Sequence, residues 1–197
     1  MKIIKNNKKC KKRGKLFIIS GPSGAGKSSL VTDALKDLDG FVRSISVTTR
    51  PKRKNELKGK RYKFISEDEF EKLKKDNQFI ECVYYCDFQY GTPKAYIEEQ
   101  LNKGKNVILE IEVKGAMQVK ERVKDAYMIF ILPPGLIHLR DRLKKRNTES
   151  VKEIEKRLKV SEEEIKYQKY YDCIIVNNDY NEALLNLKHV LNEQKGC

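Results

Sequence analysis

The chain has 197 residues, of which 39% are hydrophobic and 36% are charged. This length suits a single domain that can bury a sizeable core without the help of a metal or a disulfide. No apolar run approaches the ~20 residues that a membrane-spanning helix needs, and no secretory signal is visible. The five cysteines form no CxxC pair, which disfavours a zinc site and a disulfide framework, so a cytoplasmic location is expected.

The formal net charge is +14, and much of it lies at the N-terminus. Residues 2–15 carry seven lysines and Arg13 and no acidic residue, so residues 1–14 are predicted to form a flexible basic tail. A solvated tail is the first interpretation. Contact between this tail and a nucleic acid or another acidic partner stays open as an alternative.

Six segments are predicted as strands, because they are apolar or rich in β-branched and aromatic residues. In chain order they are residues 16–20, 41–50, 79–85, 107–111, 126–132 and 173–176. Helical periodicity predicts helices after Lys27, from about Glu67, and at 93–103, 114–123, 136–146, 150–171 and 180–193. Ser66 and Glu69 form a capping box, and Thr92 is expected to cap the helix that starts at Pro93.

Apolar strands that alternate with helices are typical of an α/β fold with a mostly parallel sheet flanked by helices. In such sheets, ligands bind beyond the carboxyl ends of the strands. A glycine-rich segment follows the first predicted strand directly, and it therefore lies at the edge where a ligand is expected.

Residues 21–28, with the sequence GPSGAGKS, match the phosphate-binding motif GxxxxGK[ST] in full. Glycines let backbone N–H groups turn toward phosphate oxygens, and the following helix N-terminus adds its positive dipole end. Lys27 is expected to reach the β- and γ-phosphates, and Ser28 to offer its hydroxyl to Mg²⁺. The ATP-binding residues expected in this loop are Gly21, Ser23, Gly24, Ala25, Gly26, Lys27, Ser28 and Ser29.

The loop alone identifies a P-loop nucleotide-binding protein and leaves kinase, ATPase and GTPase open. The Asn-Lys-x-Asp signature with which GTPases read guanine is missing, which disfavours a switch GTPase. Further along, the chain offers groups suited to a second phosphate and a guanine base: Ser46, Thr48, Thr49, Arg50, Arg53, Tyr62, Glu81, Tyr90 and Thr92. Arginine forks can each hold two phosphate oxygens, and a carboxylate in an apolar strand is costly without a partner.

The order of these motifs closely resembles that of guanylate kinases. The resemblance rests on GPSGAGKSS at 21–29, SVTTRPKR at 46–53, GKRY at 59–62, FIE at 79–81, YGT at 90–92, ILPP at 131–134 and IVNND at 175–179. It covers the chain from Lys15 to about Gln194. It implies a Mg²⁺-dependent transfer of the ATP γ-phosphoryl group to GMP, and to dGMP, in purine nucleotide metabolism.

By the same resemblance, four residues would read the guanine: Ser46, Glu81, Thr92 and Glu112. Four would hold the GMP phosphate: Arg50, Arg53, Tyr62 and Tyr90. The catalytic residues at the transferring phosphates would be Lys27, Arg50, Arg142, Arg146 and Arg157. Asn177 would lie near the adenine, and Glu110 would join Ser28 near Mg²⁺.

The resemblance also implies that residues 15–197 divide into three parts. The core would comprise residues 15–45, 93–135 and 158–197. Residues 46–92 would form a mobile GMP-binding subdomain, and residues 136–157 a helical lid. The protein is expected to act as a monomer on the small molecules ATP and GMP, without a membrane and without need of a nucleic acid.

Glu110 and Glu112 stand where the family usually has aspartates, and Lys114 where it usually has glutamine. Each glutamate adds one methylene, so that either its carboxylate reaches further or its loop retracts to compensate. Metal geometry and base recognition are therefore the features in which this chain is expected to depart from the family.

Three other functions stay open: a guanylate-kinase-like interaction module without catalysis, a different nucleoside monophosphate kinase, and a basic nucleic-acid-binding protein. The intact Gly26, Lys27 and Ser28 disfavour the first, and the combination of guanine-reading groups disfavours the second. Structural roles also stay open for the arginines as surface charges, for Glu81 as the partner of a core cation, and for Tyr62 and Tyr90 as packing aromatics.

Overall fold

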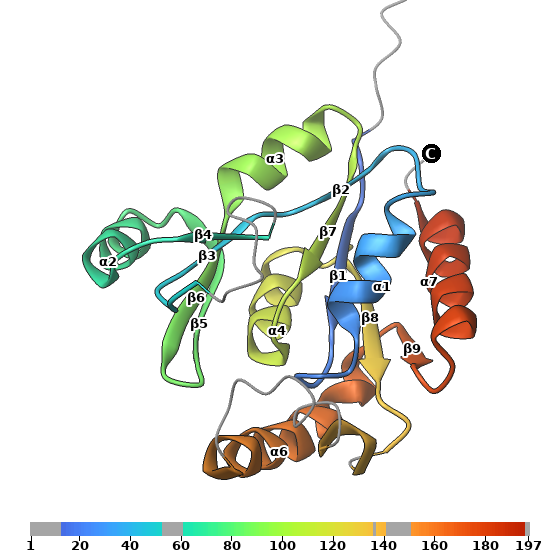
Figure 1. The fold of residues 1–197 in the computed structure, drawn as a ribbon. Coiled ribbons are helices and arrows are strands. Elements are labelled where there is room, and N and C mark those ends of the chain that lie inside the picture. Colours follow the sequence, from blue (N-terminus) through green and yellow to red (C-terminus); the bar gives the residue numbers. More distant parts are fainter. Residues whose placement is uncertain (1–12, 53–60, 136, 141–150, 196–197) are drawn as a thin grey trace, which may run out of the picture.

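The computed structural model describes residues 13–52, 61–135, 137–140 and 151–195, and from residue 155 onward the side chains of the last segment. The described elements form two β-sheets that lie side by side and are flanked by helices (Figure 1). Within the described segments, none of the helices combines the length and the apolarity needed to cross a bilayer.

The central sheet has five parallel strands in the order β2-β7-β1-β8-β9. These strands are β1 (Leu16–Ser20), β2 (Phe41–Arg43), β7 (Asn106–Glu110), β8 (Tyr127–Leu132) and β9 (Cys173–Val176). Ile19 of β1 is in register with Glu110 of β7, so β7 ends beside the point where β1 leads into the glycine-rich loop. The prediction of a mostly parallel α/β sheet is confirmed.

Helices cover both faces of this sheet, as the apolar strands require. Side chains alternate between the faces of a strand. In β1, accordingly, Phe17 and Ile19 pack on one side with α1 (Lys27–Ala34) and α7 (Tyr180–Gln194). Leu16 and Ile18 pack on the other side with α3 (Lys94–Asn102) and α4 (Val113–Arg122). All four side chains are buried.

The second sheet has four short strands in the order β4-β3-β6-β5. They are β3 (Ser46–Thr48), β4 (Tyr62–Phe64), β5 (Phe79–Tyr85) and β6 (Phe88–Pro93). Helix α2 (Glu67–Lys75) packs on this sheet through Phe70, which contacts Phe79. The predicted capping box is present, because the Glu69 N–H donates to the Ser66 hydroxyl at 3.1 Å.

Two local predictions were wrong. The segment 41–50 is not one strand, because the chain leaves the central sheet after β2 and enters the second sheet at β3. Thr92 does not cap a helix: it is buried in β6, and α3 begins at Lys94 with Pro93 as its N-cap. The Thr92 hydroxyl instead donates to the buried carboxylate of Glu81, which needs a donor more than an exposed helix end does.

Helix α6 (Val151–Ile165) lies beyond the carboxyl ends of the central strands, below the β5–β6 hairpin (Figure 1). A 3₁₀ helix, η1 (Lys166–Tyr170), follows it, so the α-helix predicted over 150–171 changes type at residue 166. At the other end of the molecule, Arg13 and Gly14 are held by α3: the Gly14 N–H donates to the Leu101 carbonyl at 2.9 Å. Residues 1–12 of the predicted tail lie outside the described residues.

Candidate active site

The glycine-rich loop connects β1 to α1 with three glycines, Gly21, Gly24 and Gly26, at positive φ. Gly21 also passes close to β8, because a Cβ at this position would lie 2.2 Å from the Ile131 carbonyl oxygen. Gly26 is the N-cap of α1, and Ser28 and the exposed Ser29 lie in the first turn of that helix. The loop therefore has the backbone shape and the helix N-terminus that a phosphate site needs.

Three side chains hold this loop, one from the loop itself and two from other parts of the chain. The Lys27 ammonium donates to the backbone carbonyls of Gly21 at 2.5 Å and Pro22 at 3.1 Å. The Asn177 amide, which follows β9, donates to the Ala25 carbonyl at 2.7 Å. Arg157 of α6 donates to the Ser23 hydroxyl.

Asn177 and Arg157 are both buried. They therefore brace the loop in this structure, while the adenine contact of Asn177 stays a prediction.

A small, partly open pocket lies between the two sheets. Its lining residues are Ser46, Tyr62, Glu81, Val83, Tyr90, Glu110, Ile111 and Glu112. Five of the residues predicted to bind GMP are thus brought together from β3, β4, β5, β6 and the end of β7. Two others, Thr92 and Arg50, contact lining residues directly.

A chain of hydroxyl groups ends on the carboxylate at one side of the pocket. The Ser46 and Thr92 hydroxyls are 2.9 Å apart, and Thr92 donates to Glu81 Oε1 at 2.6 Å. Glu81 is only 2% exposed. Burial raises the pKa of Glu81 to about 7, although the hydrogen bond from Thr92 lowers it. The carboxyl group is therefore poised between its neutral and charged forms near neutral pH.

Aromatic rings form the other side of the pocket, and a buried arginine lies against them. The Arg50 guanidinium lies 5.8 Å from the centre of the Tyr62 ring and 5.5 Å from that of Phe64. Tyr62 and Tyr90 pack edge to face with ring centres 6.0 Å apart. Burial raises the pKa of Tyr62, so its hydroxyl stays a hydrogen-bond donor at neutral pH. An arginine beside phenol hydroxyls is a suitable cradle for a phosphate.

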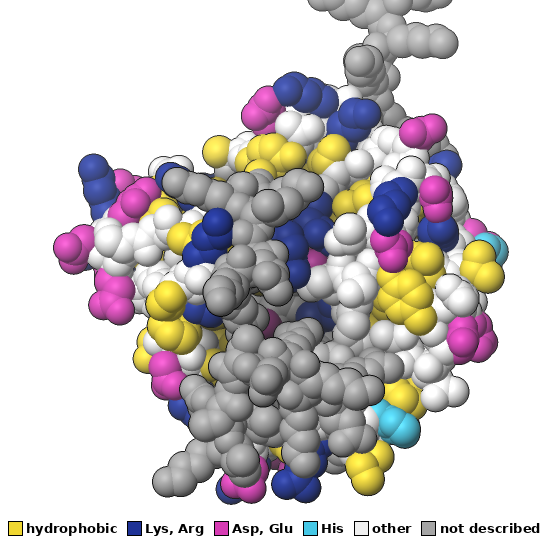
Figure 2. Space-filling model, in the orientation of Figure 1, with side chains coloured by type: hydrophobic (Ala, Val, Ile, Leu, Met, Phe, Trp, Pro, Cys, Tyr) yellow, Lys and Arg dark blue, Asp and Glu magenta, His cyan; other side chains and the backbone are white. Residues whose placement is uncertain are grey.

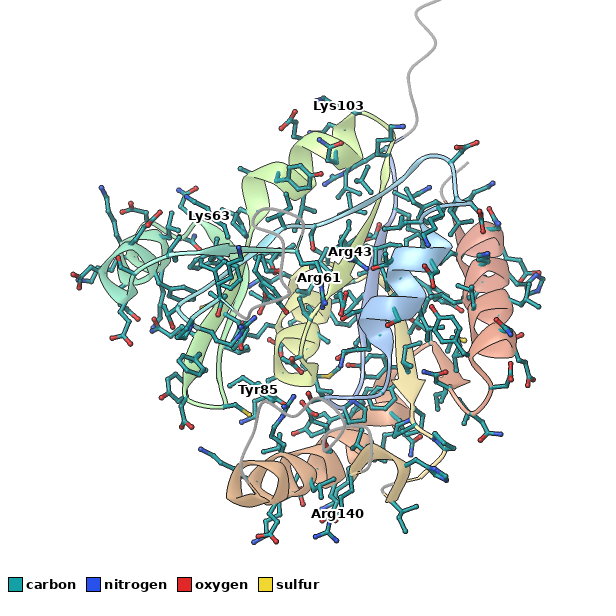
Figure 3. All side chains as sticks on the ribbon, in the orientation of Figure 1. Arg43, Arg61, Lys63, Tyr85, Lys103 and Arg140 are labelled. Atoms are coloured by element: carbon teal, nitrogen blue, oxygen red, sulfur yellow. The ribbon has the colours of Figure 1, made fainter. Side chains whose placement is uncertain are left out.

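Glu110, at the end of β7, is the meeting point of the loop and the pocket. Its Oε1 atom accepts hydrogen bonds from the Ser28 hydroxyl and, at 2.7 Å, from the Arg61 guanidinium. Its Oε2 atom lies 3.6 Å from Nη2 of Arg43, which also donates to the Ser28 carbonyl at 3.2 Å. Arg43 and Arg61 lie beside each other between the two sheets (Figure 3), where Lys and Arg side chains gather on this face (Figure 2).

The donor atoms at Glu110 fit a hard divalent cation. A hydroxyl and a carboxylate oxygen, already in contact, are ligands that Mg²⁺ accepts, and Mg²⁺ needs few protein ligands when phosphates supply the rest. In the described segments, no three His, Cys, Asp or Glu side chains are arranged to hold a metal ion by themselves.

Two further carboxyl groups lie near the lysine of the loop. Glu112 is the N-cap of α4, and Glu164 is a buried residue of α6. Burial raises the pKa of both, that of Glu164 to about 8, and the nearby Lys27 opposes the shift. The Oε2 atom of each glutamate has no hydrogen-bond partner among the described residues. Glu164 therefore keeps a proton at neutral pH that an isolated glutamate would have lost.

Comparison with known proteins agrees with this geometry. The family model for guanylate kinase matches residues 13–194. A guanylate kinase from Caldanaerobacter subterraneus is 41% identical over 94% of this chain and 90% of that protein, and one from Clostridioides difficile is 43% identical over 93% and 90%. The crystal structure of an Anaplasma phagocytophilum guanylate kinase superposes with a TM-score of 0.78 at 29% identity, covering 93% of this chain and 87% of that one.

The chain belongs to the guanylate kinase family. Members of this family are nucleoside monophosphate kinases, ATP:GMP phosphotransferases with a P-loop fold. The predictions of fold class and enzyme class are therefore confirmed. The intact phosphate loop distinguishes this guanylate kinase family member from the interaction-module alternative, because every group that the loop needs is present.

Three predicted residues, Arg53, Arg142 and Arg146, lie outside the described residues, and their roles stay predictions. Sequence reasoning missed three others at this site: Arg43, Arg61 and Glu164. Arg61 lies within the GKRY motif beside Tyr62, and Arg43 is the last residue of β2, at the carboxyl edge where ligands bind. Glu164 could not be predicted as a site residue, because it lies in a highly charged segment whose pattern is typical of a solvent-exposed helix.

Proposed function

We propose that this guanylate kinase family member transfers the γ-phosphoryl group of ATP, held on the P-loop, to GMP held in the pocket between the two sheets. One observation carries the proposal: Glu110 lines the pocket and accepts a hydrogen bond from Ser28 of the P-loop. The two anion sites therefore share a carboxylate, and the two nucleotides would meet end to end there.

The guanine would be read by Glu81, Ser46, Thr92 and Glu112. A carboxylate can accept hydrogen bonds from N1–H and the 2-amino group of guanine, which adenine does not offer in the same pattern. Thr92 orients the Glu81 carboxylate by donating to one of its oxygens, and the Ser46 hydroxyl is in turn held by Thr92. Arg50, Arg53, Tyr62 and Tyr90 would hold the GMP phosphate, as the stacking of Arg50 over Tyr62 supports.

The transfer itself needs alignment and charge neutralisation more than acid–base chemistry. The acceptor phosphate is already ionised, so no general base is required. Lys27 would leave its carbonyl partners for the β- and γ-phosphates, and Arg157 already lies against the loop. The proposed catalytic residues are Lys27, Arg50, Arg142, Arg146 and Arg157, and Asn177 would lie beside the adenine.

Mg²⁺ bound with ATP would supply charge neutralisation at the donor phosphates. Ser28 and Glu110 would hold it, since both present oxygen atoms at the junction of the loop and the pocket. For Glu110 to do so, its ion pairs with Arg61 and Arg43 have to loosen. The longer side chain of this glutamate supports such a rearrangement, because it carries the carboxylate beyond the end of β7.

Residues 46–92 are proposed to form a mobile GMP-binding subdomain and residues 136–157 a lid, both moving against a core of residues 15–45, 93–135 and 158–197. The separate second sheet supports the first part of this division. Closure would exclude water and suppress hydrolysis of ATP.

The proposed contacts involve the base and the phosphate and none of them the 2′-hydroxyl, so dGMP is proposed as a second acceptor. We also propose a monomer in the cytoplasm. The free thiols of Cys82, Cys86 and Cys173 suit a reducing compartment.

An assay of ADP formation with GMP, dGMP, AMP, CMP and UMP tests this function. We expect GMP to be clearly preferred among the four ribonucleotides, and Lys27→Ala to reduce turnover by about a hundredfold or more while the fold survives. Equal rates with all acceptors would contradict the assignment of the pocket.

A further inference from the structure

One face of α4 is bound to β5, the strand that carries Glu81. Gly115, Gln118 and Arg122 lie on this face, at the spacing of three and four residues that brings helical side chains into line. All three positions meet the short stretch 79–82 of β5. In Figure 1, α4 lies between β5 and the central sheet.

Gln118 takes the place of a neighbouring strand. In the order β4-β3-β6-β5, β5 is an end strand, so one of its edges is open to other partners. The Gln118 side-chain amide donates to the Cys82 carbonyl at 3.0 Å and accepts from the Cys82 N–H at 3.1 Å. Both backbone groups of this residue are thereby paired, as they would be in a ladder.

Arg122 fixes the strand on the other side of Glu81. Its guanidinium donates to the carbonyls of Phe79 at 3.1 Å and Ile80 at 2.5 Å. Ile80 is also buried in the core that α4 shares with the central sheet. The backbone of β5 is therefore held to α4 both before and after Glu81, which leaves little freedom for it to shift.

Gly115 makes room for the carboxyl group between these two anchors. A Cβ at residue 115 would lie 2.6 Å from Oε2 and 3.2 Å from Cδ of Glu81. The opposite oxygen, Oε1, is held by Thr92. The obstructed atoms belong to the end of a side chain and not to the backbone, so an added methyl group displaces the carboxylate before it disturbs the fold.

We propose that Gly115 is a specificity-determining position of this enzyme, because its missing side chain creates the space in which Glu81 faces the guanine base. Gln118 and Arg122 are positioning residues that fix α4 against β5 and so make this space depend on residue 115. The inference deepens the proposed function and rests on the proposed role of Glu81 in reading guanine.

Gly115→Ala tests this directly. We expect the KM for GMP to rise by about tenfold or more, because the charged hydrogen-bond acceptor is displaced, while the KM for ATP and the melting temperature change little. Gly135→Ala is a matched control, since a Cβ there would make only an ordinary contact of 3.8 Å with His138. A KM for GMP that stays within about twofold of the parent value would overturn the proposal. So would an equal rise in the KM values for GMP and ATP.

A double-mutant cycle with Glu81→Asp separates crowding from general damage. Aspartate withdraws the carboxylate from residue 115, so Gly115→Ala should add less than about twofold to the KM for GMP in that background. Additive effects would contradict the proposal. If Gly115→Ala alone fails to fold, the double variant should fold, and its failure would show that the glycine is needed only for packing.

The failure of this inference and of the proposed function can be told apart with Glu81→Gln. If this variant keeps the parent KM for GMP, the proposed role of Glu81 is wrong. If it loses GMP binding while Gly115→Ala does not, only the inference about Gly115 is wrong.

Discussion

The hydroxyl of Ser28, in the P-loop, donates a hydrogen bond to the carboxylate of Glu110 at the end of β7. The same carboxylate oxygen accepts from Arg61 at 2.7 Å, and Arg61 directly precedes β4 of the second sheet. One side chain therefore connects the donor loop to the part of the molecule that would carry the acceptor. A glutamate reaches this position more easily than an aspartate would, because its carboxylate is one methylene further from the backbone.

Removing Arg61 should strengthen metal–nucleotide binding. In Arg61→Gln, Glu110 loses a competing cation, so we expect Mg·ADP to bind about two- to fivefold more tightly, a modest gain because the Arg61 side chain is 35% exposed. Isothermal titration calorimetry measures this. Lys63→Gln, which removes an exposed lysine of β4 paired with Glu69, is the control and should leave the affinity unchanged. Weaker binding in Arg61→Gln would show that the arginine assists the nucleotide instead.

GMP use should depend on pH through Glu81. Burial raises the pKa of this carboxyl group to about 7, and the guanine edge, with its N–H donors, binds the charged form better. Below pH 7 the Glu81 carboxyl group of the free enzyme is protonated. As the pH is lowered, kcat/KM for GMP should therefore fall by about tenfold per pH unit, and above pH 8 it should be constant.

The Glu81→Gln variant provides the reference for this profile. The GMP phosphate itself titrates near pH 6, and that contribution remains in the variant. The difference between the two profiles should show the group with a pKa near 7. Identical profile shapes would contradict the assignment.

Neighbouring residues of α6 should differ sharply in their importance. Lys156 pairs with Asp87 at 2.9 Å on the tip of the β5–β6 hairpin, and both side chains are exposed, whereas the buried Arg157 contacts the P-loop. Lys156→Ala should change stability by less than about 1 kcal/mol and turnover little, because exposed ion pairs contribute little. Arg157→Ala should lower kcat by about a hundredfold or more, since it removes charge from the transferring phosphates. Steady-state kinetics and thermal melts compare the two variants. An equal loss of kcat in both would contradict the proposed role of Arg157.

Glu164 should make the enzyme less stable at alkaline pH. Burial, with the charge of Glu112 as a second cause, raises its pKa from 4.5 to about 8. The folded state therefore holds a proton that the unfolded state has lost, so this group favours folding at low pH and that advantage disappears as the pH rises through 8.

Glu164→Gln removes this dependence. The free energy of unfolding of the variant minus that of the parent should rise by more than about 1 kcal/mol from pH 5.5 to pH 8.5. Denaturant unfolding measures both values. The exposed Glu162→Gln on the same helix should show no such gain. A pH-independent difference for Glu164→Gln would refute the prediction.

Contiguous features could be predicted from the sequence, and features made by tertiary contact could not. The bounds of β1, β5 and β9 agree with prediction, because an apolar run bounded by turn residues determines each of them locally. The strands β4 and β6 were missed, since they are short, contain polar residues and depend on pairing with β3.

The same division holds for the site. The P-loop is one uninterrupted motif. Glu81 could be predicted because a carboxylate in an apolar strand is costly to bury without a partner. Arg43 and Arg61 act through Glu110, which is distant from both in the sequence, and Thr92 was misread because its partner, Glu81, is reached only across the β5–β6 pair.

Calorimetry of Glu81→Gln with GMP and with a non-hydrolysable ATP analogue tests the central claim most directly. If the buried carboxylate reads the guanine, the GMP affinity of this variant falls by about tenfold or more, while its affinity for the ATP analogue changes less than about twofold. Equal weakening of both ligands would mean that Glu81 supports the fold and does not read the base.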